Sequence, residues 1–191
     1  MDDETIRRLK DLITTGKKNG YVLYDDIDEL LPEDYAGGRE VDDILSDVDR
    51  AGIEILEEPR IALDERIERG DEFIQQVEDF SDDPVMVYLR EVGTLPLLSS
   101  EGERELAKRI QGGGRDAEIA IKELVEANLR LVVFIARRYT SRGIHILDLI
   151  QEGNNALLKA AYQFDPACSY RFSTSATWWV RRALSRTASR K

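Results

Sequence analysis

The chain has 191 residues, of which 42% are hydrophobic and 34% charged, so it can bury the core of one domain or of two small ones. No apolar run approaches the roughly 20 residues of a membrane-spanning helix and no signal-peptide pattern opens the chain, so we expect a cytoplasmic protein with no membrane partner. One cysteine, Cys168, excludes an internal disulfide, and the only histidine, His145, lies too far from it in sequence to suggest a metal site.

The net charge of −11 conceals a division between the two halves of the chain. Residues 1–83 carry 10 basic and 27 acidic residues, whereas residues 84–191 carry 17 and 11, and residues 166–191 hold six basic residues and no acid. Such asymmetry is typical of an acidic module joined to a basic nucleic-acid module. The plainer alternative is an acidic solubility segment beside an ordinary helical domain. Under the first reading, the acidic half competes with DNA for the same positive field.

Helical periodicity dominates the sequence, and we therefore expect an all-α fold. Three short amphipathic helices are predicted in the first 57 residues, and they form a small acidic three-helix bundle. Their apolar positions are Ile6, Leu9 and Ile13; Ile27, Leu30 and Leu31, ended by Pro32; and Val41, Ile44, Leu45 and Val48, ended near Gly52. Residues 58–83 are dense in charge and are read as a linker between this domain and a second one over 84–191.

The second domain is predicted to be entirely helical. A short helix begins at Val85, and a capping box formed by Ser100 and Glu103 opens the next helix, which the glycines at 112–114 end. A long helix is then expected over 116–139 and another over 146–164. Asp165 and Pro166 separate the latter from a last helix that starts near Ser173.

The last helix has two distinct faces when its residues are placed 100° apart. An inward stripe is formed by Phe172, Ala176, Trp179, Val180, Ala183 and Leu184. The opposite face carries Trp178, Arg181, Arg182 and Ser185, and we expect it to be exposed. Aromatic rings beside arginines suit the unstacked bases and phosphates of a single strand, and Tyr170 and Phe172 just before the helix could add further rings.

Several motifs, in order along nearly the whole chain, resemble the N-terminal portion of a bacterial primary (housekeeping) sigma factor of RNA polymerase. Two segments, residues 20–34 and 52–59, resemble the acidic first region of such a factor. Residues 83–93 and 96–98 resemble its second conserved block. The central domain is resembled by Asn-Leu-Arg-Leu-Val-Val at 128–133, Asp-Leu-Ile-Gln-Glu-Gly-Asn at 148–154, and residues 172–174 with 176–179. The C-terminal domains of such factors have no counterpart here, and the sequence leaves open whether the end at Lys191 is natural.

The resemblance implies two binding sites and a masking role for the acidic region. The first site binds a coiled coil of the largest subunit of core RNA polymerase, through Asp148, Gln151, Glu152, Asn154, Asn155 and Lys159. The second binds the non-template strand of the −10 promoter element and captures its flipped bases, through Tyr170, Arg171, Phe172, Thr174, Trp178, Trp179, Arg181, Arg182, Ser185 and Arg186. The acidic region is implied to mask DNA binding until promoter DNA displaces it. No cofactor, metal or small-molecule ligand is implied.

Departures from the family pattern leave a second hypothesis open. Ser175 replaces a tyrosine that stacks on the key flipped adenine, Arg182 replaces a glutamine, and 167–169 replace a basic approach to the aromatics. The chain could therefore be a degenerate sigma-like regulator that binds core polymerase, melts promoters poorly and competes with the complete factor. An enzyme is not expected, because no phosphate loop, nucleophile–base set or metal-ligand spacing occurs.

Overall fold

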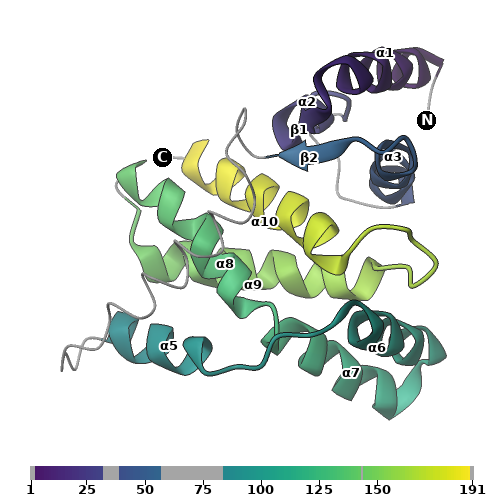
Figure 1. Ribbon diagram of the computed structural model, residues 1–191. Coiled ribbons are helices and arrows are strands. Elements are labelled where there is room, and N and C mark those ends of the chain that lie inside the picture. Colours follow the sequence, from purple (N-terminus) through teal and green to yellow (C-terminus); the bar gives the residue numbers. More distant parts are fainter. Residues whose placement is uncertain (1–2, 32–38, 57–83, 143, 190–191) are drawn as a thin grey trace.

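The computed structural model describes residues 3–31, 39–56, 84–142 and 144–189 (Figure 1). The expected charged linker at 58–83 lies outside these residues. The described chain is almost entirely helical, which confirms the all-α prediction apart from one small sheet. None of the described helices is long and apolar enough to cross a membrane.

The N-terminal elements contain the predicted helices and, in addition, a small parallel sheet. Helix α1 (Asp3–Asn19), α2 (Tyr24–Asp28) and α3 (Arg39–Arg50) pack with strands β1 (Tyr21–Leu23) and β2 (Glu54–Leu56). The strands pair in parallel, with Tyr21 opposite Glu54 and Leu23 opposite Leu56. The second helix ends at Asp28, before the predicted Leu30. Strands of three residues are too short for an alternating pattern to stand out in the sequence.

The C-terminal elements form a bundle around three mutually packed helices. These are α8 (Leu129–Ala136), α9 (Ile146–Gln163) and α10 (Phe172–Ser189), with the 3-10 turn η1 (Arg137–Arg142) after α8. Helix α5 (Pro84–Gly93) packs on α8, while α6 (Ser100–Gly112) and α7 (Gly114–Glu126) pack side by side at one end (Figure 1). A close approach of α8 to α9 requires Gly153, because an added Cβ would lie 2.5 Å from a methyl group of Val132.

Two local predictions for this part of the chain are wrong. The long helix expected over 116–139 is divided between α7 and α8 at Asn128, whose side chain donates to the carbonyl oxygen of Leu124 at 2.8 Å. The N-cap of α6 is Ser99 rather than Ser100, and its Oγ accepts from the backbone N–H of Gly102 at 3.1 Å. Glu103 therefore falls one residue beyond the capping-box position, and its carboxylate bonds elsewhere.

The N-terminal elements lie against α10, on the side away from α9 (Figure 1). Helix α3 contacts α10 directly, and the hydroxyl of Tyr24 in α2 donates to the carbonyl oxygen of Thr174 at 3.3 Å. The side of α10 that the sequence analysis expected to face solvent thus has the acidic N-terminal elements packed on it.

Candidate nucleic-acid and polymerase interfaces

Two arginines of α10 that the sequence predicts to face outward are paired with carboxylates of α2. Arg181 forms an ion pair with Asp25, and Arg182 forms one with Asp28. The Arg182 guanidinium also lies over the Trp178 ring, 5.2 Å from its centroid, and that of Arg181 lies 5.7 Å from the centroid of Tyr24. Two acidic side chains therefore occupy the guanidinium groups that the sequence predicts to bind nucleic-acid phosphates.

The prediction that this face is exposed is wrong for Trp178, Arg181 and Arg182, whereas Ser185 is exposed. Trp178 is 1% exposed and Arg182 8%, and the Arg181 side chain 16%. Trp178 is as buried as the inward stripe and belongs to the same hydrophobic cluster, because other elements cover the ring. It lines one small pocket with Tyr24 and Asp28 of α2 and Tyr139 of η1. A helix some 150 residues earlier in the chain therefore contributes to its burial, and no periodicity within α10 could reveal this.

The rings before and within the inward stripe belong to the core. Tyr170 and Phe172 both pack edge-on against Phe164, with centroids 6.2 and 5.3 Å away, and both are buried. Trp179 is buried beside Trp178, with the two rings at 84°. The inward stripe is confirmed, because its members are buried apart from the half-buried Ala183. The suggestion that Tyr170 and Phe172 offer further exposed rings is wrong here.

The remaining predicted DNA-binding residues reach solvent to different degrees. Ser185 and Arg186 are exposed near the end of α10, Thr174 is half-buried, and Arg171 just before the helix is exposed. Ser175, which stands where the family pattern has a tyrosine, is 1% exposed. A tyrosine at that position would need more space than this arrangement leaves.

A partly buried polar cluster joins α3 to the segment that leads into α10. The Tyr170 hydroxyl donates to Oδ1 of Asp42 at 2.6 Å, and the Ser46 hydroxyl lies 3.9 Å from the Cys168 sulfur. Burial raises the pKa of the Asp42 carboxyl, against the opposing effect of the Tyr170 hydrogen bond, and nearby Asp165 adds to the rise. Burial likewise raises the pKa values of Tyr170 and Cys168. The protein thus holds a desolvated carboxylate at this contact.

Replacing Asp42 with Asn is expected to stabilise the protein at neutral pH. A carboxyl whose folded-state pKa is raised stabilises the fold fully below its unfolded-state pKa, and that contribution is lost as pH rises through the folded-state value. Asp42→Asn keeps an acceptor for Tyr170 without a buried charge, so its unfolding midpoint should exceed that of the wild type at pH 7. The difference should shrink as pH falls toward the ordinary value of 3.8.

Thermal unfolding between pH 4 and pH 7 measures this difference. Asp49→Asn is the matched control, since Asp49 is an exposed acid at the end of the same helix. An equal gain in both variants at pH 7 would contradict the argument, because simple relief of charge repulsion would then explain it.

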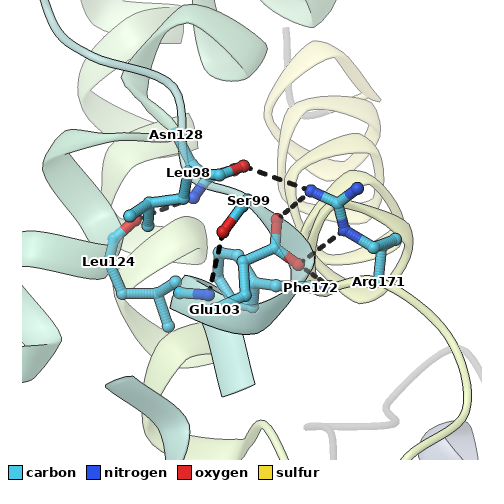
Figure 2. A network of polar contacts seen from close by, with 8 residues as sticks. Leu98, Ser99, Glu103, Leu124, Asn128, Arg171 and Phe172 are labelled. Carbon is cyan, nitrogen blue, oxygen red and sulfur yellow. Dashed lines mark hydrogen bonds and ion pairs between the residues drawn. The ribbon is translucent and has the colours of Figure 1, made fainter. Parts of the chain in front are cut away.

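A buried carboxylate of α6 joins that helix to the start of α10. Glu103 accepts from Nε and Nη2 of Arg171 at 2.8 and 2.7 Å, and from the backbone N–H of Phe172 at 3.2 Å (Figure 2). The same Nη2 lies 3.4 Å from the carbonyl oxygen of Leu98. The hydrogen bond from Arg171 to Glu103 raises the pKa of the Arg171 guanidinium. The sequence pattern predicts a local cap for Glu103 and gives no sign of this network.

The predicted polymerase-binding face of α9 is present as one polar surface. Asp148, Gln151, Glu152, Asn155 and Lys159 are all exposed. Asn154 lies off this face: it is half-buried, and its Nδ2 donates to the Tyr88 hydroxyl of α5 at 3.3 Å.

Two exposed apolar residues, which the sequence analysis missed, continue the same face. Leu158 is 39% exposed and Tyr162 61%. Leu158 follows Asn155 by three residues, and Tyr162 follows Leu158 by four, which places both side chains on one side of the helix with Asn155. The signal was available in the sequence, because helical phase puts residues 148, 151, 155, 158 and 162 in one row. Such a row suits a partner helix with apolar and polar side chains.

The described residues offer no evident place for a metal. Over 3–31, 39–56, 84–142 and 144–189, no group of three or more His, Cys, Asp or Glu side chains could hold an ion.

Comparison with protein-family models gives three adjacent matches that together span most of the chain. Residues 3–83 match sigma-70 factor region 1.1, residues 83–116 match sigma-70 factor region 1.2, and residues 124–191 match sigma-70 region 2. The chain belongs to the sigma-70 family. The resemblance inferred from the sequence motifs is thereby confirmed. In sigma-70 terms, α1 to β2 lie in region 1.1, α5 and α6 in region 1.2, and α8 to α10 in region 2.

Relatives within the sigma-70 family support the same assignment. The chain is 42% identical over 96% of its length to "RNA polymerase sigma factor SigA" of Clostridium acetobutylicum, of which it covers 47%. It is 41% identical over 94% of its length to the protein of that name from Lactococcus lactis subsp. cremoris, and 40% identical over 95% to that of a Bacillus species. The chain spans about half the length of these curated relatives.

Proposed function

We propose that this chain acts in transcription initiation by binding core RNA polymerase and recognising and melting the −10 promoter element. The α9 face, which runs from Asp148 to Tyr162, docks on a coiled coil of the largest polymerase subunit. The α10 face holding Trp178, Arg181 and Arg182 binds the non-template strand of the −10 element. The sigma-70 family membership and the names of the relatives support both partners.

We propose further that region 1.1 masks the α10 face in the free protein. The observation that carries this proposal is the pairing of Asp25 and Asp28 with Arg181 and Arg182. Carboxylates and phosphates compete for the same guanidinium groups, so bound DNA and the docked α2 exclude each other. The wrongly predicted exposure of Trp178 then has a functional meaning, because the ring becomes available only after α2 leaves.

The free energies of base stacking and base flipping favour DNA opening within a larger assembly. Stacking one base on an aromatic ring is worth about 1–3 kcal/mol, which is similar to the few kcal/mol needed to flip a base from a duplex. The protein alone therefore has little surplus with which to open DNA and displace its own acidic region. Core polymerase supplies the additional contacts.

A forked promoter duplex that contains a −10 element tests the function. The protein is mixed with core polymerase, and complex formation and strand opening are recorded in parallel. Both should depend on the protein. Complex formation without opening would contradict the proposed melting activity and would instead match the sigma-like regulator left open by the sequence. Absence of any complex would contradict the polymerase-binding role.

A further inference from the structure

Glu103 is an acidic side chain in an unusually buried position. It is 4% exposed, and a buried carboxylate is costly unless charge-assisted hydrogen bonds compensate for its lost hydration. Both oxygens are used: Oε1 accepts from Nη2 of Arg171, and Oε2 accepts from its Nε and from the N–H of Phe172 (Figure 2). The two-point pairing of a planar guanidinium with a carboxylate fixes direction as well as distance.

The backbone N–H of Phe172, which donates to Glu103, lies where α10 begins. The first N–H groups of a helix have no partner within the helix, and negative charge near them is favourable because the helix dipole is positive there. The first turn of α10 contains no acidic residue of its own. Glu103 therefore supplies from α6 the negative charge that this turn lacks. Arg171 connects the same carboxylate to the residue just before the helix.

We propose that Glu103 of region 1.2 is a positioning residue for the DNA-binding face of α10, and that Arg171 holds Glu103 rather than a promoter phosphate. This inference rests on the proposed function of α10. The carboxylate fixes the first turn and hence the rotation of the helix that presents Thr174, Trp178 and Arg181. The Leu98 carbonyl oxygen, 3.4 Å from Nη2 of Arg171, adds a second link to the chain before α6.

The sign of one substitution distinguishes positioning from simple electrostatics. Glu103→Gln keeps the length and one acceptor oxygen of the side chain but removes its charge. Removing a negative charge near bound DNA ordinarily strengthens binding, because phosphates are then less repelled. A positioning role predicts the opposite, since the first turn of α10 and the Arg171 side chain lose their shared anchor. Arg171→Lys keeps a positive charge for a phosphate but loses the two-point geometry, so it should also weaken binding.

The test uses the full chain bound to core polymerase and a single-stranded oligonucleotide carrying the −10 sequence. Glu103→Gln and Arg171→Lys are each expected to lower oligonucleotide affinity about tenfold, with core affinity within about twofold of wild type. The double variant should lose little more than either single one, because both act through one contact. The slope of log affinity against log salt should not change in Glu103→Gln, since no phosphate contact is lost.

Glu105→Gln is the matched control, because Glu105 is an exposed acid of the same helix and loses the same charge. It should leave oligonucleotide affinity unchanged or slightly raised. Equal oligonucleotide affinities for Glu103→Gln and Glu105→Gln would overturn the proposal. It would also be overturned if Arg171→Lys kept wild-type oligonucleotide affinity while Arg171→Gln lost it. A parallel loss of core affinity and unfolding temperature would also overturn it, as it would indicate a merely structural role. Failure of the wild-type complex to bind the oligonucleotide would instead count against the proposed function.

Discussion

Deleting residues 1–57 is expected to raise the affinity of the free protein for a single-stranded −10 oligonucleotide by roughly 10- to 100-fold at low salt. The deletion removes the carboxylates that pair with Arg181 and Arg182 and the α2 side chains beside Trp178. Two arginines become available to phosphates, so the dependence of log affinity on log salt should steepen by about 1.4, at ~0.7 per phosphate for single strands. Fluorescence anisotropy across a salt series measures both quantities.

Substitutions in the intact chain separate masking from the general effect of charge. Asp25→Asn with Asp28→Asn should reproduce part of the gain, mainly through Asp28, because its partner Arg182 is the more buried of the two arginines. Asp11→Asn with Asp49→Asn changes the net charge equally at two exposed positions. If the two pairs of substitutions raise affinity equally, long-range charge rather than docking of α2 controls binding.

Replacing Leu158 and Tyr162 with alanine is expected to weaken binding to core polymerase by at least 2 kcal/mol, or about 30-fold. Both side chains are exposed in the free protein and continue the polar face of α9. Burial of apolar side chains against a partner helix supplies much of the free energy in such interfaces, while the flanking polar residues fix register and orientation. Competition binding against labelled wild-type protein measures the loss.

A second exposed apolar position provides the control for α9. Ile119 of α7 is 47% exposed and does not lie on the α9 face. Ile119→Ala should leave polymerase affinity within about twofold of wild type. Unchanged affinity in the Leu158→Ala/Tyr162→Ala variant would exclude this end of α9 from the interface, and an equal loss in Ile119→Ala would show that the effect is not specific to it.

Local sequence patterns predicted most helices and the inward stripe of α10, because these depend on residues within one or two turns. Phe172, Val180 and Leu184 are buried as the 100° period requires. Helical phase failed where a segment far away in the sequence determines whether a side chain is exposed. Trp178 was predicted to be exposed, yet it is buried, and residues of α2 and η1 line the pocket beside it. Helical phase gives the direction of a side chain relative to its own helix and carries no information about what packs there.

The polar contacts also depend on residues that lie far apart in the sequence, so local patterns do not predict them. Ser99 and Ser100 are both adequate N-caps by composition, and only the folded chain selects Ser99. That choice moves Glu103 past the capping-box position and leaves its carboxylate for Arg171, 68 residues away. Likewise, the separation of charge between the two halves suggests that acidic residues compete with DNA, but it does not identify Asp25, Asp28 and Asp42 as the ones that contact the predicted DNA-binding segment. The three-residue strands and the break at Asn128 are also too short to be detected from hydrophobic periodicity.

The docking of region 1.1 on α10 is most directly tested through the two tryptophans of the chain. Acrylamide quenching of their fluorescence is compared between the free full-length protein and the charge-reversed variant Asp25→Arg/Asp28→Arg, with circular dichroism to verify that helix content is unchanged. Weak quenching in the wild type and clearly stronger quenching in the variant are predicted, because Tyr24 and Asp28 of α2 line the pocket around Trp178 and repulsion from the two arginines displaces α2 in the variant. Equal quenching of the two proteins, or ready quenching of the wild type, would contradict the docked arrangement.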